Sequence, residues 1–333
     1  PLTSVFSSPD RVSFAKVDRP IEGVPVEAFE LADDNLTVEL WARSPLVYSP
    51  VAMDFDAQGR LWLTEGIDYN QGLRVQAGRS IMVVEDTDGD GKADRSHPFV
   101  TEKDVRHAPL GIAVFDNRVV LSATPSIIVY TDVDRNAVFD PEIDKREVFL
   151  TGFQNKNHDH TVHAVVGAPS GQWHFSFGNC GADLKTKDGR HYLAGCYYGY
   201  PEAIGKKSWD GEVYVGGMTM RINPDGTGLE PTGENMRNPH DMFVTSQGDA
   251  FQSDNDDPAH CRSSWVMEHA NMGYADLRDG SRSWEEVAKT WEEPAGWNRS
   301  LRFSRSHWRE NYPGAFPPGS VYGAGSPTGN VFI

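Results

Sequence analysis

Apolar and polar residues alternate in short stretches that are joined in pairs by turn residues along most of the chain. The clearest pair is VAMDFDAQGRLWLTEG (51–66), in which the alternation stops at a Gln-Gly turn and resumes after it. Three more copies lie at 111–124, 163–179 and 241–255. An alternation with a period of two around Gly, Asn or Asp turns predicts antiparallel β-hairpins.

Further strand patterns lie between the hairpins, at 80–86, 126–132 and 216–226. The hairpins begin near positions 53, 112, 164 and 242, so each unit has about four strands in 52 to 78 residues. A repeat of four antiparallel strands on this scale is typical of a β-propeller blade. The longest unit carries an insertion at 185–211. The pattern therefore predicts an all-β fold, a β-propeller of four-stranded blades.

The domain organisation follows from these units. We expect residues 1–35 to be an irregular lead-in and residues 36–333 to form the propeller domain, with about four blades and the start of a fifth. Because propellers close to protect their strand edges, a further segment would complete the ring. The alternative is a four-bladed ring with a tail. The best helix pattern is at 283–293, where Ser283 is a candidate N-cap.

Composition excludes several classes of function. Gly and Pro number 32 and 21 of 333 residues, as in turn-rich β proteins. Asp and Glu number 48 against 31 Lys and Arg, and a net charge of −17 repels nucleic acid. No apolar run is long enough for a transmembrane segment. Of the three cysteines, Cys180 and Cys196 could pair in a disulfide, or all three could be thiols.

Five phrases carry a family resemblance: EDTDGDGKAD (85–94), HTVHAVVGAPSGQWHFSFGN (160–179), RINPDGTGLE (221–230), RNPHDM (237–242) and YGAGSPTG (322–329). Together they resemble the six-bladed pyrroloquinoline-quinone (PQQ) sugar dehydrogenases of the glucose and sorbosone type. The chain is most similar to the membrane-bound dehydrogenase-like proteins of Planctomycetes and Verrucomicrobia. The resemblance implies a secreted PQQ enzyme that oxidises a sugar or a sugar-derived alcohol or aldehyde. Electrons would leave to a cytochrome c or another acceptor.

Three histidines, His158, His160 and His163, lie within six residues before the third hairpin. An imidazole titrates near neutral pH, which suits a general base. The resemblance implies that His160 is the base that takes the substrate hydroxyl proton. His163 is the rival for that role and otherwise a cofactor contact. A metal site that includes Asp159 is an alternative, as are hydrogen-bonded loop histidines.

The motif Arg237-Asn238-Pro239 precedes the fourth hairpin. An arginine presents a planar set of donors that suits quinone oxygens, and it stabilises negative charge as hydride arrives. The resemblance implies that Arg237 acts in catalysis and that Asn238 contacts the cofactor. Asp241 and Arg106 are further candidate cofactor contacts.

The sequence departs from this family at two places. His240-Asp241 follows the motif where the family carries Gln-Gly. At the position near 106–114 where the family supplies an amide, this chain has Arg106 or His107.

Two acidic loops have the spacing of calcium ligands. Carboxylates recur at alternate positions, with Gly where the first loop turns, in the set Asp86, Asp88, Asp90, Asp94 and in the set Asp132, Asp134, Asn136, Asp140. The alternative is a pair of hairpin turns that hold no ion. Weak calcium sites would fill outside the cell, which favours a periplasmic or extracellular location.

Two other segments are candidates for the site. The carboxylates and amide of 254–257 could hold a calcium ion or line the mouth of the channel, and Tyr197, Tyr198 and Tyr200 could line a substrate cleft. Nucleotide-binding and serine-hydrolase motifs do not occur in the sequence. The alternatives to a dehydrogenase are a calcium-stabilised propeller that binds glycan or protein, and a metal-dependent hydrolase or lyase that uses the histidines.

Overall fold

The computed structural model describes residues 29–31, 33, 35–65, 79–102, 109–154, 159–196, 198–255, 261–275 and 315–323. Its regular structure within these ranges is almost entirely β-strand, with one short 3-10 helix at Pro201–Ala203. The all-β prediction is therefore confirmed. The helix predicted at 283–293 and most of the lead-in at 1–35 lie outside the described residues.

Each predicted hairpin opens a sheet of its own. The first sheet holds β1 (Pro50–Phe55), β2 (Leu61–Glu65), β3 (Arg79–Glu85) and β4 (Arg95–Glu102), and the second holds β5 (Gly111–Phe115), β6 (Arg118–Ala123), β7 (Ser126–Thr131) and β8 (Lys145–Thr151). The third holds β9 (Val162–Gly167), β10 (Trp173–Phe177), β14 (Met218–Ile222) and β15 (Glu230–Glu234), with β19 (Ala270–Asn271) parallel to β15 at its edge. The fourth holds β16 (Pro239–Val244), β17 (Ala250–Asp254), β18 (Cys261–Val266) and β20 (Ser320–Gly323). Apart from β19, neighbouring strands in these sheets are antiparallel, as in propeller blades.

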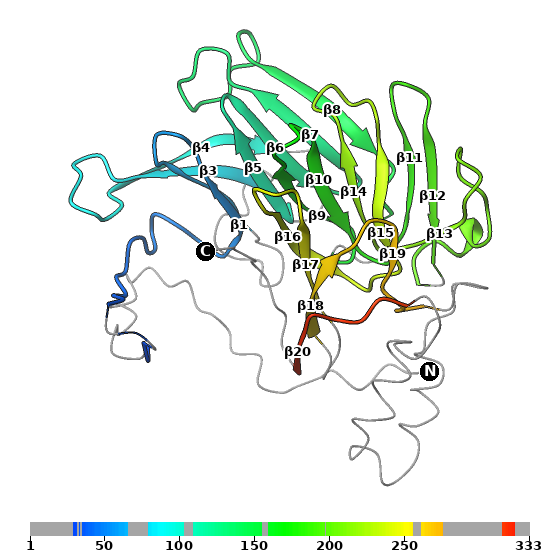
Figure 1. Ribbon diagram of the computed structural model, residues 1–333. Coiled ribbons are helices and arrows are strands. Elements are labelled where there is room, and N and C mark those ends of the chain that lie inside the picture. The colour runs from blue at the N-terminus through cyan, green and yellow to red at the C-terminus, as the bar shows by residue number, and fades with distance from the viewer. Residues whose placement is uncertain are drawn as a thin grey trace, which may run out of the picture.

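The sheets succeed one another around a common centre. The first strand of each sheet lies beside the first strand of the next, so β1 contacts β5, β5 contacts β9, and β9 contacts β16 (Figure 1). This order makes β1, β5, β9 and β16 the inner strands of successive blades. The prediction of a β-propeller of four-stranded blades is confirmed, and the six-bladed count stays a prediction.

Apolar side chains fill the spaces between successive blades. Between the first two, Trp62 and Phe99 pack against Leu121 and Tyr130. Between the second and third, the core contains Val129, Phe149, Trp173, Phe175 and Met220. A third cluster, including Met236, Met242 and Tyr274, joins the third and fourth blades. Burial of these faces against one another is what orders the blades around the axis.

The insertion predicted at 185–211 forms a small sheet between β10 and β14. It consists of the antiparallel pair β11 (Ala182–Lys185) and β12 (His191–Gly195), followed by β13 (Tyr214–Val215), which is parallel to β12. Figure 1 shows this sheet at the side of the third blade.

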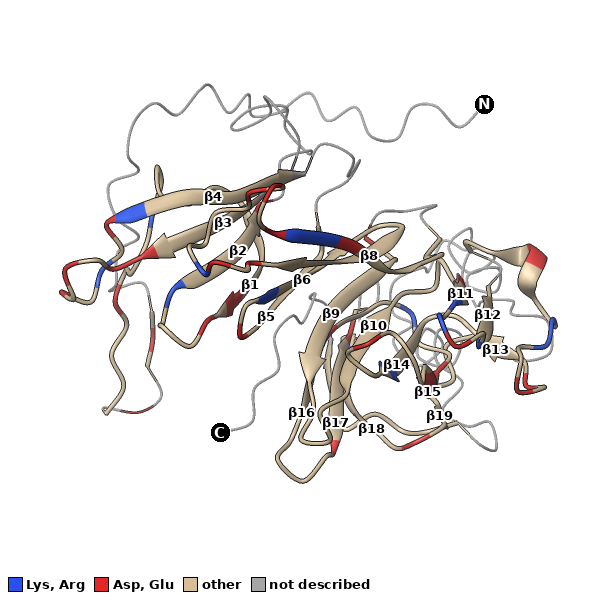
Figure 2. Ribbon diagram, turned by 90° about the horizontal axis from the view of Figure 1, so that it is seen from above, with Lys and Arg blue, Asp and Glu red and all other residues tan. Residues whose placement is uncertain are grey.

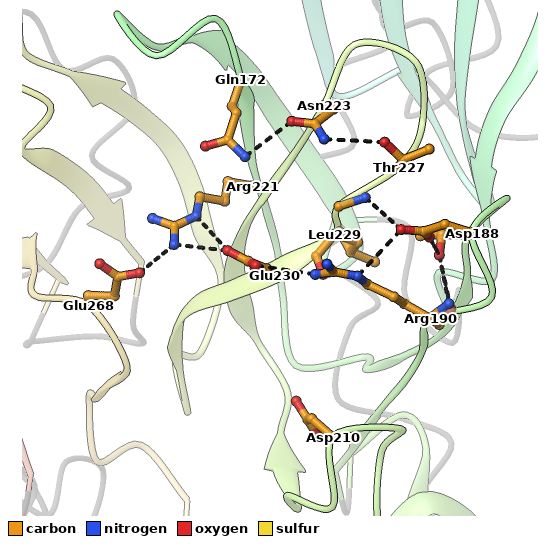
Figure 3. A network of polar contacts seen from close by, with 12 residues as sticks. Gln172, Asp188, Arg190, Asp210, Arg221, Asn223, Thr227, Leu229, Glu230 and Glu268 are labelled. Atoms are coloured by element: carbon orange, nitrogen blue, oxygen red, sulfur yellow. Dashed lines mark hydrogen bonds and ion pairs between the residues drawn. The ribbon is translucent and has the colours of Figure 1, made fainter.

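A polar network fastens the turn of the insertion to the third blade (Figure 3). Arg190, in the turn between β11 and β12, donates to the carbonyl oxygen of Leu229 at 3.0 Å and to Glu230 at 3.2 Å. Arg221 in turn lies between Glu230, at 2.9 Å, and Glu268, at 2.5 Å. The outer end of the insertion is thus held by charged groups that are partly exposed.

The last described strand belongs to the fourth blade. Residues 322 and 323, which the sequence pattern assigns to the opening of a fifth blade, lie in β20, and β20 pairs with β18. The rest of this predicted opening, 324–333, lies outside the described residues.

Acidic residues lie on many of the turns that join the strands (Figure 2), in keeping with the net charge of −17. In the part of the chain that the structure describes, no helix is both long and apolar enough to cross a membrane.

Candidate functional site

The segments that carry the predicted site residues both end at an inner strand. His160 lies two residues before β9, and Arg237 and Asn238 directly precede β16. Because β9 and β16 occupy equivalent places in adjacent blades, these two segments lie at the same end of the propeller. The hydroxyl of Ser176 donates to the carbonyl oxygen of Pro239 at 2.8 Å, which ties the two blades together at this end.

A Gly-Asn turn after β10 joins the two segments. The backbone N–H of Asn179 donates to the carbonyl oxygen of Arg237 at 2.8 Å, and its side-chain oxygen accepts from Nδ1 of His160 at 2.7 Å. A Cβ on Gly178 would lie 2.6 Å from Oδ1 of Asn238 and 2.8 Å from the carbonyl oxygen of His160. The structure therefore brings His160, Arg237 and Asn238 together, although 77 residues separate the first two.

His160 is held in one tautomer. Its imidazole is only 7% exposed, and an amide oxygen can only accept, so the proton lies on Nδ1 and the lone pair on Nε2. The ring of Tyr198 lies 5.4 Å from the ring of His160, between centroids. Asn179, which fixes this tautomer, was missed by the sequence analysis. It is the last residue of the phrase 160–179, in the Gly-Asn pair that ends the third hairpin.

His163 lies in a different environment from His160. It is fully buried, and its Nε2–H donates to Oδ1 of Asn238 at 2.7 Å. Burial first, and then the nearby ring of His240 at 4.5 Å, hold the pKa of His163 well below its usual value. Burial also lowers the pKa of His240. A neutral, buried His163 is suited to orienting the Asn238 amide rather than to accepting a substrate proton.

Asp254, at the end of β17, holds the backbone of the Arg237-Asn238 segment. Its two carboxylate oxygens accept the backbone N–H groups of Arg237, at 3.0 Å, and of Asn238, at 2.6 Å. Burial raises the pKa of Asp254 to about 7, while these two N–H donors and the charges of Arg237 and Arg262 oppose the rise. The guanidinium of Arg237 donates from Nη1 to the carbonyl and side-chain oxygens of Asn255, at 3.0 and 2.7 Å. Asp254 thus acts through backbone contacts rather than at the mouth of the channel.

Asp241 lies in β16, three residues after Asn238. The carboxylate of Asp241 accepts the backbone N–H of Met242 at 2.8 Å, within β16. Tyr200 lies in the insertion and donates to Asp183 at 3.4 Å. Arg106, His107, His158, Tyr197, Asp256 and Asp257 lie outside the described residues.

The metal-site alternative for the histidines finds no ligand set in the described chain. Among the residues that the structure describes, the only groups of three or more His, Cys, Asp or Glu ligand atoms within 4.8 Å of one another are carboxylates of the acidic loops. His160 and His163 instead bond to different amides, those of Asn179 and Asn238.

The first acidic loop gathers Asp86, Asp88 and Asp94. Backbone N–H groups of Gly89 and Gly91 already donate to Asp86, at 2.7 and 2.8 Å. These donors lower the pKa of Asp86, Gly91 having the largest effect. These donors also fix the orientation of the Asp86 carboxylate, an oxygen ligand of the kind that a hard cation prefers.

The second acidic loop gathers Asp132, Asp134 and Asp144, so Asp144 takes the place that the sequence pattern gives to Asp140. The N–H of Asp140 donates to Asp144 at 2.7 Å, and the N–H of Asn136 donates to Asp132 at 3.2 Å. Asp132 and Asp144 are only 4% and 7% exposed. Burial raises the pKa of Asp132, and the charge of Asp144 adds to the rise. A cation here would offset the repulsion between these buried carboxylates.

Comparison with solved structures finds propellers at low identity. The calcium structure of the Trichoderma reesei enzyme of carbohydrate-active family AA12 is 12% identical, with a TM-score of 0.49 over 83% of this chain and 68% of that one. The PQQ-bound aldose sugar dehydrogenase of Streptomyces coelicolor is 14% identical, with a TM-score of 0.46 over 71% of this chain and 65% of that one. The PQQ domain of pyranose dehydrogenase from Coprinopsis cinerea, in its holo form, is 14% identical, with a TM-score of 0.44 over 68% of this chain and 54% of that one. This chain thus spans between about half and two thirds of the length of these structures.

No curated protein matches the sequence. One family model does, the one described as a domain of unknown function, DUF7133, and it matches residues 26–311. Since that match covers most of the chain, the protein belongs to the DUF7133 family.

Proposed function

We propose that this protein is a PQQ-dependent dehydrogenase that oxidises a sugar or a sugar-derived alcohol, in the periplasm or outside the cell. The observation that carries the proposal is the contact of Asn179 with both sides of the site. Its side-chain oxygen accepts the Nδ1–H of His160, and its backbone N–H holds the segment that contains Arg237 and Asn238. The proposal depends on these residues and on the sequence resemblance.

The donors in the cluster fit an anionic quinone that bears carboxylates. Arg237 supplies a permanent positive charge and a planar set of N–H donors. Asn238 has its side-chain oxygen engaged by His163, so the amide presents its NH₂ group as the donor. Arg237 and Asn238 are the residues that would hold the cofactor. When bound, the quinone would supply the hydride acceptor.

The proton chemistry falls to His160. Its Nε2 lone pair would take the proton of the substrate hydroxyl as the neighbouring carbon is oxidised. The imidazolium that forms keeps its Nδ1–H bond to Asn179, which becomes stronger when the donor is charged. Arg237 would stabilise the negative charge that develops on the acceptor side. His163 and Asp254 hold Asn238 and the backbone of Arg237 in place, and are therefore positioning residues.

The test is a dye-reduction assay on protein incubated with PQQ and calcium, with a panel of aldoses and polyols. We expect reduction with at least one sugar. His160→Ala should lower the rate about 10²- to 10⁴-fold without changing the melting temperature much. His191→Ala is the matched control, because His191 lies in the insertion, bonded to Asp183 at 2.7 Å.

Two outcomes would count against the proposal. If the protein binds PQQ, as seen by its absorbance, but none of the sugars supports dye reduction, the result favours the alternative of a non-redox propeller that binds glycan. If His160→Ala retains the full rate, His160 is not the base.

We also propose that the acidic loops bind calcium. The second loop is the stronger candidate, because a cation would offset the cost of burying the neighbouring carboxylates of Asp132 and Asp144.

A further inference from the structure

Two buried cysteines flank the inner end of the insertion. Cys180 lies two residues before β11, and Cys196 directly follows β12. Both are thiols in this structure, and both side chains are fully buried. The polar network of Figure 3 holds the opposite end of the insertion, at Arg190.

The register of the β11–β12 pair indicates which residues would face each other beyond its inner end. In the β11–β12 pair, Ala182 faces Ala194 and Lys185 faces His191, so the numbers of paired residues have a constant sum. Cys180 and Cys196 have the same sum and lie two positions beyond the last pair, where this register would set them opposite each other, although a turn closed by the N–H of Gly181 on Gly178 precedes β11. Directly opposed residues of antiparallel strands have Cα atoms about 4.5–5.5 Å apart, which lies within the span of a disulfide, about 4.4–6.8 Å.

Contacts around the two cysteines support this placement independently of the register. Cys196 and Tyr200 exchange backbone hydrogen bonds of 3.2 and 2.9 Å, which close the turn between them. Within that turn, a Cβ on Gly199 would lie only 2.4 Å from the Cα atom of Cys180. The turn that begins at Cys196 therefore folds directly onto Cys180.

We propose that Cys180 and Cys196 form a disulfide that fastens the insertion to the turn holding His160. The backbone N–H of Cys180 donates to the carbonyl oxygen of His160 at 3.2 Å, and the preceding residue is Asn179. On the other strand, the turn after Cys196 carries Tyr198, whose ring lies against His160. A bond between the two cysteines joins both supports of His160. This inference does not depend on the proposed dehydrogenase activity.

The chemistry is a two-electron oxidation by a disulfide oxidant, such as oxidised glutathione. The thiolate of one cysteine attacks the oxidant and releases one reduced thiol. The second cysteine's thiolate then attacks the mixed disulfide and releases the other. The two cysteines lose two protons and two electrons, and the oxidant becomes two thiols. Because both cysteines are fully buried, we expect the exchange to occur during folding, before the insertion packs against the blade.

Counting thiols tests the proposal without any assay of activity. The chain is refolded in a buffer of oxidised and reduced glutathione, denatured in acid, alkylated with N-ethylmaleimide and weighed by mass spectrometry. We expect one adduct, on Cys261, and three adducts after full reduction, because the chain has three cysteines. Cys261→Ser should then show no adduct, and Cys180→Ser should show two.

Three adducts on the oxidised wild-type protein would overturn the proposal. So would a peptide map that links Cys261 to either of the other two. As a second readout, full reduction should lower the melting temperature by a few °C in Cys261→Ser but not in the Cys180→Ser/Cys196→Ser double variant. An inactive protein with one adduct would refute the dehydrogenase and leave the disulfide standing, and an active protein with three adducts would do the reverse.

Discussion

Replacing Gly178 with alanine tests the close approach on which the candidate site depends. The new Cβ would lie 2.6 Å from Oδ1 of Asn238 and 2.8 Å from the carbonyl carbon and oxygen of His160. The His160 atoms are backbone and cannot swing away, so the Asn238 side chain must retreat by about 0.8 Å to reach an ordinary contact of 3.4 Å. That movement stretches or breaks the 2.7 Å hydrogen bond from His163.

The cost can be worked out from these contacts. Overpacking of a tight site costs about 1–3 kcal/mol, and a buried hydrogen bond that is lost adds about 1–3 kcal/mol. The lower backbone entropy of alanine in the unfolded chain offsets about 0.4–1 kcal/mol. We therefore expect Gly178→Ala to lower the free energy of unfolding by about 1–5 kcal/mol, which corresponds to a melting temperature roughly 3–13 °C lower.

The assay is thermal unfolding followed by circular dichroism, with Gly167→Ala as the matched control. A Cβ on Gly167 meets only the Phe115 ring, at 3.1 Å, and that ring can tilt, so its cost should stay below about 1 kcal/mol. The imidazole N–H signal of His163 in the proton spectrum should be lost in Gly178→Ala and kept in Gly167→Ala. If Gly178→Ala melts within 1–2 °C of the wild type and keeps this signal, the geometry described here is wrong.

Three further predictions concern stability. Burial raises the pKa of Glu234 to about 7, so the folded state favours the protonated carboxyl. The stability that this group contributes is therefore present at acid pH and is lost as the pH rises through 7. In thermal melts, the free energy of unfolding of Glu234→Gln should rise relative to that of the wild type between pH 5 and pH 8, by up to about 3 kcal/mol. A constant difference across that range would refute the raised pKa of Glu234. A chelator should lower the melting temperature, and calcium should restore it. Calcium at a hundredfold excess over its dissociation constant should raise the free energy of unfolding by about 2.7 kcal/mol, and Asp132→Asn should lose more of this stabilisation than Asp86→Asn. A melting temperature that chelator does not change would show that both loops are free of ions. Trp173→Ala should cost about 3–5 kcal/mol in denaturant unfolding, because Trp173 stacks on Phe115 at 5.1 Å within the core between blades, and a loss below 1 kcal/mol would contradict that packing.

The blades could be predicted because each hairpin carries its own local pattern. Period-two alternation and a turn residue define a strand pair without reference to the rest of the chain, and all four hairpins appear in the structure as β1–β2, β5–β6, β9–β10 and β16–β17. The first strand of each predicted hairpin is also the inner strand of its blade. The pairing of β20 with β18 could not be predicted, because a partner strand 50 or more residues away leaves no signal in a local pattern.

The site was predictable only in part, for the same reason. His160, Arg237 and Asn238 stand out because they lie in phrases shared with a known family. Asn179 ends the same phrase as His160, but its role comes from a fold that sets the end of β10 between two segments. Sequence spacing also made His160 and His163 rivals. The structure distinguishes their roles, because full burial makes His163 a neutral donor to Asn238.

The distribution of the site over two blades has a consequence for how it forms. The proposed base belongs to the third blade, the proposed cofactor contacts belong to the fourth, and Asn179 and Ser176 hold the two together. The bond between His160 and Asn179 lies within the third blade, whereas the contacts of Asn179 with Arg237 and of Ser176 with Pro239 join the two blades. The site therefore comes into being only when the apolar faces of the third and fourth blades, with Met236 and Met242 between them, have closed. Packing between these blades is thus a precondition of the chemistry, and a substitution in that interface should disturb His160 and Arg237 together rather than one at a time.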